Sequence, residues 1–205
     1  YSLIYMLPLS AKIPFNWRDL TPVSVVALDQ FVLWDNAEGP KTVKDFIAAA
    51  KAASSPFKMG GTGSKREDHV LTGFMEQKTG PKFSYLPYKS GGEAATQLVG
   101  KHTEANVNNP SENLEVWRAG QVRALCVFDK ERIAYKTKVT ETQSWNDVPT
   151  CKEEGLDVEI LEVNRNKAER LGLDFGTYAF TLSVPPNNSV PIRGSIRDAY
   201  RDNAF

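Results

Sequence analysis

The sequence lacks features that several common classes of protein need. No stretch of its 205 residues approaches the roughly 18 consecutive apolar residues of a membrane-spanning helix. Lysine and arginine together number 25, as do aspartate and glutamate, so there is no excess of positive charge for a nucleic-acid partner. No low-complexity run is present, and 41% of the residues are hydrophobic. We therefore expect a globular protein that does not bind nucleic acid.

Cysteine is scarce as well. Cys126 and Cys151 are the only two, which is too few for a disulfide scaffold, and their spacing is unlike that of zinc ligands. We interpret them as two small, half-buried residues without a partner. If the protein is exported, a disulfide between them is the alternative.

Motifs for catalysis are also absent. Gly63 is followed directly by Ser64, so the glycine-rich stretch does not have the spacing of a P-loop. The densest titratable cluster, Glu67-Asp68-His69, is interpreted as a polar helix face, because consecutive helix residues point in different directions. His102 is expected at the surface. The sequence therefore predicts no catalytic residue, no metal, no cofactor and no enzymatic activity.

Strand and helix patterns alternate along the chain. Dense Val, Leu and aromatic content predicts one bent strand or two short ones over 22–36, and Thr42 is expected to cap a helix over 42–53. Further strands are predicted at 57–59, 83–86, 103–107 and 122–128, and further helices at 64–78, 90–99 and 110–117. Such alternation predicts right-handed crossovers and a mostly parallel sheet, so the expected fold class is α/β.

Three loops of this predicted sheet are rich in small and polar residues: 60–64, 87–92 and 106–111. Ligands of open α/β sheets sit beyond the carboxyl ends of the strands, where these loops are expected to converge. In the first loop, Gly60, Gly61 and Gly63 allow close approach of a ligand, and Ser64 is expected to cap the next helix. Free amides at a helix start attract a carboxylate or phosphate. The alternative is a tight glycine turn without a ligand.

The second and third loops offer similar chemistry. Tyr88 is expected to wall a pocket and Lys89 to neutralise an acid, while a hydroxyl and two glycines begin the next helix at Ser90, Gly91 and Gly92. A solvated lysine and an ordinary helix cap are the alternative. In the third loop, the amide of Asn108 either donates to a carboxylate or simply holds a turn.

A series of segments, in order, resembles one protein family. They are Ile13-Pro-Phe-Asn-Trp-Arg-Asp-Leu-Thr-Pro22, Lys41-Thr-Val-Lys-Asp-Phe-Ile47, Met59-Gly-Gly-Thr-Gly-Ser64, Leu86-Pro-Tyr-Lys-Ser-Gly-Gly92, Trp117-Arg-Ala-Gly-Gln-Val-Arg-Ala-Leu125 and Asp147-Val-Pro-Thr-Cys-Lys-Glu-Glu-Gly155. Together they make residues 12–159 resemble the substrate-binding proteins of tripartite tricarboxylate transporters, the Bug family of bacterial periplasmic receptors.

The resemblance implies a two-lobed, Venus-flytrap receptor without enzymatic activity. Such a receptor, expected as a periplasmic monomer, captures a small organic acid (a tri- or dicarboxylate, an acidic amino acid or an aromatic acid) and passes it to membrane permease subunits. The expected ligand-binding residues are Gly61, Thr62, Gly63, Ser64, Tyr88, Lys89, Ser90, Gly91, Gly92 and, with less support, Asn108.

The expected organisation has four parts. Residues 1–33 correspond to a remnant of the first lobe and a hinge strand, 34–124 to the second lobe with the ligand loops, 125–160 to the return hinge and a first-lobe segment, and 161–205 to an atypical tail. The family's signal peptide and its Pro-x-Gly-Gly loop have no counterpart here, so the first lobe is expected to be incomplete. Residues 157–182 weakly resemble outer-membrane secretins, and the alternative function is a structural or envelope-assembly protein that binds no ligand.

Overall fold

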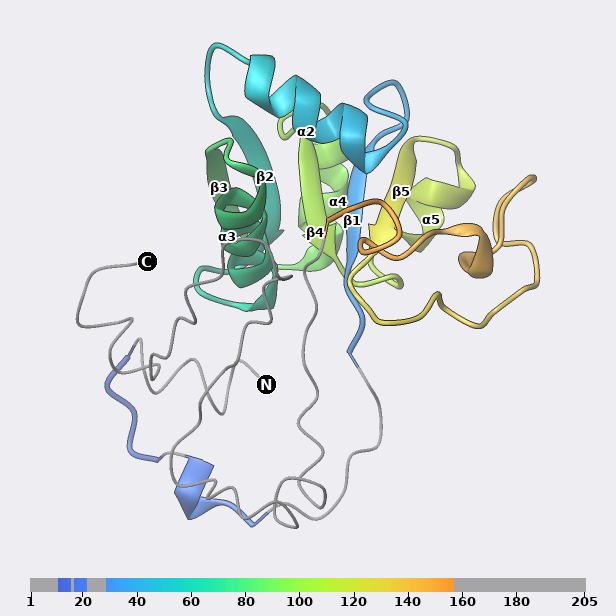
Figure 1. The fold of residues 1–205 in the computed structure, drawn as a ribbon. Coiled ribbons are helices and arrows are strands. Elements are labelled where there is room, and N and C mark those ends of the chain that lie inside the picture. The colour runs from blue at the N-terminus through green and yellow to red at the C-terminus, as the bar shows by residue number, and fades with distance from the viewer. Residues whose placement is uncertain (1–10, 16, 22–28, 157–205) are drawn as a thin grey trace, which may run out of the picture. The chain divides into compact units, whose positions relative to one another are not determined.

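A five-stranded sheet forms the centre of the computed structural model, which describes residues 11–15, 17–21 and 29–156 (Figure 1). The strands are β1 (Val32–Asn36), β2 (Phe57–Thr62), β3 (Phe83–Tyr88), β4 (Ala105–Asn108) and β5 (Val122–Val127), in the order β3-β2-β4-β1-β5. β2 pairs parallel with β3 and β4, whereas β1 is antiparallel to both β4 and β5. The predicted α/β class is confirmed, with β1 as the strand that runs against the others.

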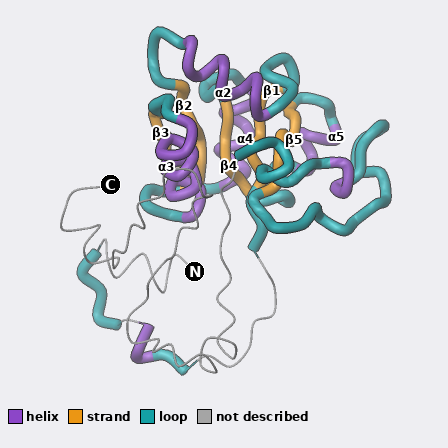
Figure 2. Tube along the Cα trace, in the orientation of Figure 1, coloured by secondary structure: helices purple, strands orange, loops and turns teal. Residues whose placement is uncertain are grey.

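Helices alternate with these strands along the chain (Figure 2). They are α2 (Val43–Ala52), α3 (Glu67–Thr79), α4 (Gly91–Val99) and α5 (Leu114–Arg118), with 3-10 helices η2 (Trp17–Asp19) and η3 (Trp145–Asp147). Thr42 caps α2 as predicted, because its Oγ1 accepts from the Asp45 amide at 3.1 Å. Within the described ranges, no helix combines the length and apolar character needed to cross a bilayer.

Some predicted boundaries were wrong. The strand predicted at 103–107 spans Ala105–Asn108, and the helix predicted over 110–117 begins only at Leu114. The strand predicted over 22–36 has its described part at Val32–Asn36, and residues 22–28 lie outside the described ranges. By its internal contacts the chain divides into two units, Tyr1–Ile160 and Leu161–Phe205. The second unit, which holds the expected tail, and the start of the secretin-like segment also fall outside the described residues.

Two apolar clusters cover the two faces of the sheet. Successive residues of β1 alternate between them, as expected for a strand buried on both sides. Leu33 packs in one cluster with Phe46 of α2 and side chains of α3. Trp34 packs in the other with Leu98 of α4 and Trp117 of α5. The helices therefore form two layers, with α2 and α3 on one face of the sheet and α4 and α5 on the other (Figure 1).

A disulfide joins Cys126 to Cys151, with the two Cα atoms 4.8 Å apart. The interpretation of these residues as unpaired was therefore wrong. The segment after η3 returns beside β5, where the Val127 amide donates to the Pro149 carbonyl and the Cys151 amide to the Val127 carbonyl, both at 2.9 Å. This return brings together two residues that are 25 positions apart in sequence.

Asp35 is a buried carboxyl in β1, with only 2% of its surface exposed. Its Oδ2 has no hydrogen-bond partner in the described part of the chain. Burial raises the pKa of Asp35 to about 7, against the smaller opposite effects of a hydrogen bond with Asn36 and the charge of Arg123. The folded protein therefore holds this proton over a pH range in which the unfolded chain has released it.

We expect Asp35→Asn to be more stable than the wild type at pH 8 by about 1–2 kcal/mol and less stable or equal at pH 4. Because the folded pKa lies above the unfolded one, wild-type stability is highest below the unfolded pKa and falls as the pH rises towards 7. The amide stays neutral, although its buried Nδ2 limits the gain. Urea unfolding of both proteins at pH 4, 6 and 8 checks this, and parallel stability curves would contradict it.

Candidate functional site

The loops that follow the parallel strands gather at one edge of the sheet. The Gly63 amide donates to the Tyr88 carbonyl at 2.9 Å, which ties the loop after β2 to the end of β3. The Asn109 side chain, after β4, donates to Asp29 Oδ1 at 2.6 Å and to the Gln30 carbonyl at 2.8 Å, just before β1. The two predicted ligand loops after β2 and β3 therefore lie side by side, and the third reaches the start of β1.

The glycine-rich stretch after Met59 differs from the predicted turn. Gly60, Gly61 and Thr62 belong to β2, and Gly61 pairs with Pro87 of β3. Ser64 is exposed and does not cap a helix, because α3 begins at Glu67 without a side-chain cap. We call residues 63–66 the β2–α3 loop.

Close packing explains why glycine continues the strand at residue 61. A Cβ on Gly61 would lie 2.8 Å from the Cβ of Asp68 and even closer to the Tyr85 hydroxyl. Only a residue without a side chain leaves room for these two groups above β2. These contacts come from residues of β3 and α3. The pattern of neighbouring residues, which predicted a turn at the Gly-Gly pair, therefore does not reveal them.

Two amides of this stretch donate to the protein's own side chains, and the Gly63 amide donates to a backbone carbonyl. The Thr62 amide donates to Asp68 Oδ2, and the Lys65 amide donates to His69 Nδ1 at 3.1 Å. Asp68 is 4% exposed, so the interpretation of this tripeptide as a solvated face was wrong for Asp68. Burial raises the pKa of Asp68, and the hydrogen bond from Thr62 acts in the opposite direction. This stretch therefore has fewer free donors for an anion than its glycines predict.

The start of α4 has a side-chain cap. Ser90 Oγ accepts from the Glu93 amide at 3.2 Å. Glu93 Oε2 accepts from the Lys89 amide at 3.0 Å, one residue before the cap, rather than from the Ser90 amide of a capping box. Ser90 thus forms the ordinary helix cap that was given as the alternative. Gly91 and Gly92 are the first two residues of α4, so their amides have no acceptor inside the helix. With the positive end of the helix dipole, these amides are the candidate anion-binding position, in which Gly91 is buried and Gly92 is exposed.

Gly91 lies against two side chains from the loop after β4. A Cβ at this position would come within 2.6 Å of both Asn108 Oδ1 and Glu112 Cγ, whereas the nearest atom to a Cβ on Gly92 is Glu112 Oε2 at 3.7 Å. No sequence pattern predicted that Glu112 reaches the start of α4. The carboxylate of Glu112 is negatively charged, so it affects which acids can bind beside the amides of Gly91 and Gly92.

The two neighbouring glycines provide a matched pair of variants. We expect Gly91→Ala to lower the free energy of unfolding by roughly 1–3 kcal/mol through overpacking against the buried Asn108. Gly92→Ala has the space it needs and is expected to be neutral or slightly stabilising, because alanine favours the helix. Thermal unfolding of both variants checks this. Equal melting temperatures would contradict the close approach at Gly91.

Asn108 is 1% exposed and supports the start of α4. Its Nδ2 donates to the Gly91 carbonyl at 2.9 Å and to Asn113 Oδ1 at 2.7 Å. Asn113 in turn donates to Asn106 Oδ1 at 3.3 Å. The arrangement supports the alternative that this amide holds a turn, and a direct contact between Asn108 and a ligand stays a prediction.

The described ranges contain no group of three or more His, Cys, Asp or Glu side chains placed to hold a metal ion. His102 is exposed, as predicted. Tyr88, at the end of β3, is partly buried, and burial together with the charge of Glu93 raises the pKa of its hydroxyl. The hydroxyl of Tyr88 therefore keeps its proton and is a neutral donor at this edge of the sheet.

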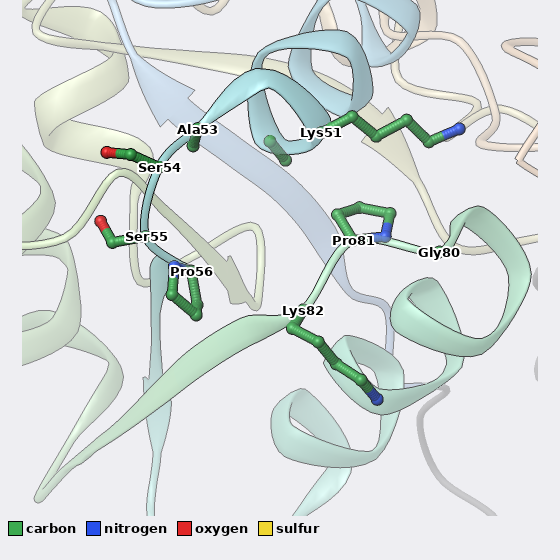
Figure 3. Close-up of a pocket in the computed structure, with 9 residues that line it drawn as sticks. Lys51, Ala53, Ser54, Ser55, Pro56, Gly80, Pro81 and Lys82 are labelled. Carbon is green, nitrogen blue, oxygen red and sulfur yellow. The ribbon is translucent and has the colours of Figure 1, made fainter.

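A hollow of about 330 Å³ lies at the other end of the sheet, between the turn after α2 and the turn after α3 (Figure 3). Its polar groups are the exposed side chains of Lys51, Ser54, Ser55 and Lys82. It adjoins the amino ends of β2 and β3 and is separate from the loops that follow these strands. We assign no function to this hollow, because its donors are solvated and do not converge.

Comparison with known proteins decides the family. The TctC family, described as the tripartite tricarboxylate transporter family receptor, matches residues 2–159. The chain belongs to this family. Its members are described as receptors of tripartite tricarboxylate transporters. The predicted resemblance is confirmed, and the matched range ends before the tail at 161–205.

Relatives of the TctC chain are found among bacterial proteins. It is 31% identical over 159 residues to the UPF0065 protein in the gbd 5' region of Cupriavidus necator. This match covers 76% of this chain and 45% of that protein. It is 32% identical over 133 residues to the protein BugT of Bordetella pertussis, covering 62% and 39%. The chain therefore spans about half the length or less of these curated relatives.

Solved structures share the TctC fold. A ligand-free TctC solute-binding protein from Polaromonas is 31% identical, with a TM-score of 0.55, covering 63% of this chain and 42% of that one. MatC from Rhodopseudomonas palustris, with bound malate, is 18% identical, with a TM-score of 0.62, covering 73% and 49%. The likeness to MatC concerns the fold alone, and both matches support the periplasmic-binding-protein class predicted from the sequence.

Proposed function

We propose that this chain captures a small organic carboxylate in the periplasm and delivers it to the membrane subunits of a tripartite transporter. The observation that carries the proposal is the hydrogen bond from the Gly63 amide to the Tyr88 carbonyl, which places the two predicted ligand loops side by side next to the start of α4. Membership of the TctC family supports the receptor role.

The amides of Gly91 and Gly92 hold one carboxylate of the ligand, and the helix dipole of α4 strengthens this contact. Tyr88 forms a partly apolar wall beside them, and the exposed ammonium of Lys89 attracts the acid from solution. The β2–α3 loop closes the other side through Gly63 and Ser64. Because few formal charges touch the ligand, release to a permease stays easy.

The disulfide between Cys126 and Cys151 supports the periplasmic location. Stable disulfides of this kind form in oxidising compartments, such as the bacterial periplasm, and are rare in the cytosol. The permease subunits as partners and a monomeric state belong to the same proposal. Size exclusion with light scattering tests the monomer, and a stable dimer would contradict it.

Calorimetric titration with malate, citrate, aspartate and benzoate tests the ligand class. Thermal unfolding in the presence of each acid gives a second readout. At a ligand concentration one hundred times its dissociation constant, a bound acid raises the free energy of unfolding by about 2.7 kcal/mol. The methyl ester of the same acid, with every carboxyl esterified, is the control, because it keeps the carbon skeleton and loses the carboxylate charges. Binding of the ester as tightly as the acid, or binding of no acid, would contradict the proposal.

The contribution of the helix amide is tested with Gly92→Pro. Proline is tolerated in the first turn of a helix but has no N–H, whereas Gly92→Ala keeps the donor and serves as the matched control. Loss of one hydrogen bond to a charged group is expected to weaken binding roughly tenfold to a hundredfold in the proline variant alone. Equal affinity in the two variants would place the carboxylate elsewhere.

A further inference from the structure

The β2–α3 loop has an unusual backbone. Gly63 and Lys65 both have positive φ values, 66° and 60°. This conformation is unfavourable for a lysine and persists where neighbouring groups hold it in place. The two ends of the loop make backbone hydrogen bonds, from the Gly63 amide to the Tyr88 carbonyl and from the Val70 amide to the Arg66 carbonyl, both at 2.9 Å. The further contacts that fix the loop between these ends come from side chains outside residues 63–66.

Three side chains supply these contacts. Tyr85 Oη, from β3, donates to the Gly63 carbonyl at 2.9 Å. His69 Nδ1, from the first turn of α3, accepts from the Lys65 amide at 3.1 Å. Asp68 accepts from the amide of Thr62, directly before the loop. The loop is thus held at its start, at its first carbonyl and at its strained residue.

The side chains also support one another. The rings of His69 and Tyr85 are stacked, with centroids 4.0 Å apart and planes only 6° from parallel. Asp68 and the Tyr85 hydroxyl both pack above Gly61, where a side chain would displace them. Tyr85, Asp68 and His69 therefore form one unit between β2, β3 and α3, which we call the loop clamp.

We propose that Tyr85 and His69 are positioning residues that hold the β2–α3 loop in the shape that receives the ligand, and that protonation of His69 releases the loop. The proposal rests on the function proposed above, because the loop borders the ligand through Gly63. Neither residue needs to touch the acid.

The chemistry of histidine gives this clamp its pH dependence. His69 Nδ1 accepts a hydrogen bond only in the neutral ring, because both nitrogens carry protons in the cation. Protonation would therefore direct an N–H at the Lys65 amide and break the contact. Tyr85 keeps its proton throughout, since burial and the charge of Asp68 raise the pKa of its hydroxyl.

The charges around His69 act in both directions. Partial burial lowers its pKa most, Glu76 of the same helix raises it, and Lys65 of the loop lowers it. On β3, the group that faces His69 is the neutral ring of Tyr85. Besides burial, the charges of Asp68 and Glu67 raise the pKa of the Tyr85 hydroxyl, and the charge of Arg66 lowers it. At neutral pH the ring is uncharged and the clamp is closed, and it opens as the pH falls below the ordinary range of histidine.

Amide exchange of the ligand-free protein tests the clamp directly. We expect the protection of the Lys65 amide, corrected for the intrinsic rate, to fall about tenfold between pH 7.5 and pH 5 in the wild type. In His69→Asn the side-chain oxygen can take the place of Nδ1 as an acceptor and does not titrate, so protection should stay constant. Equal pH dependence in both proteins, or no change in the wild type, would overturn the proposal.

Titration with malate links the clamp to binding. Over the same pH range, the affinity of the wild type should fall about threefold to tenfold more than that of His69→Asn, because titration of malate itself weakens binding equally in both proteins. Tyr85→Phe keeps the stacked ring and loses the bond to Gly63, so it should bind about threefold to tenfold more weakly at pH 7.5. If Tyr85→Phe does not fold, the His69 comparison decides alone.

The two proposals fail in different ways. Acid binding that has the same pH dependence in the wild type and in His69→Asn would overturn the role of the clamp and leave the receptor function intact. No binding of malate or of the other acids by the wild type would overturn the receptor function, and with it the role of the clamp in binding.

Discussion

Replacement of Trp34 by alanine is expected to lower the free energy of unfolding by about 3–5 kcal/mol. Trp34 is completely buried in β1 and lies at the centre of three tryptophans. Its ring is 5.8 Å from that of Trp117 and 5.9 Å from that of Trp145, both in edge-to-face arrangements. Alanine would leave a cavity where α5, η3 and the sheet meet.

The indole also has a polar contact at the ligand edge, because Nε1 donates to the Asn108 carbonyl at 3.3 Å. Urea unfolding followed by circular dichroism measures the loss. Tyr135→Ala is the control, since Tyr135 is 54% exposed and its removal should change stability by less than about 0.5 kcal/mol. Similar effects of the two substitutions would contradict the buried position of Trp34.

Removal of the disulfide is expected to cost about 3 kcal/mol. Cys126 and Cys151 close a loop of 25 residues, and a crosslink of that size restricts the unfolded chain by about this free energy. The double variant Cys126→Ala/Cys151→Ala removes the crosslink without leaving a single reactive thiol. Reduction of the wild type under denaturing conditions, followed by refolding with reductant present, should give a similar loss.

Thiol titration of the unfolded protein without reductant provides the direct control for the disulfide. The wild type should show no free thiol without reductant and two after reduction. The double variant has no thiol in either condition, and its stability should match that of the reduced wild type. Two free thiols in freshly purified protein, together with unchanged stability of the double variant, would contradict the bond between Cys126 and Cys151.

Local signals predicted the elements whose ends are fixed by local contacts. The start of α4 was predicted from the hydroxyl of Ser90 and the glycines after it, and the cap joins Ser90 to an amide only three residues further on. The start of α2 followed from Thr42 in the same way. At these positions, neighbouring residues in the sequence are also neighbours in space, and a pattern of residue types is sufficient.

Long-range contacts decided what the sequence did not predict. Gly61 continues β2 because Tyr85 and Asp68 pack above it, and both come from other elements. Asp68 consequently became buried instead of solvated. Likewise, the return of the chain beside β5 brought the two cysteines together, and no sequence spacing carries that information. The opposite direction of β1 has the same origin in the pairing of distant strands.

The candidate site was predicted by position and corrected in detail. The loops after β2 and β3 adjoin one another as expected, through Gly63 and Tyr88. The donors, however, are unequally distributed between them, because Thr62 and Lys65 already donate to side chains of α3, while Gly91 and Gly92, the first two residues of α4, have no acceptor inside the helix. We therefore expect the main donors to the ligand carboxylate at the start of α4 rather than in the glycine-rich stretch after Met59.

An NMR titration of the backbone amides with an organic acid tests the central claim most directly. As malate or another bound acid is added, the amide signals of Gly91 and Gly92 should shift downfield and saturate together, because they donate to its carboxylate. Signals from the turn after α2, near Ser54 and Ser55, should stay in place. Saturable shifts confined to that turn, or none at Gly91 and Gly92 with any acid, would contradict the account.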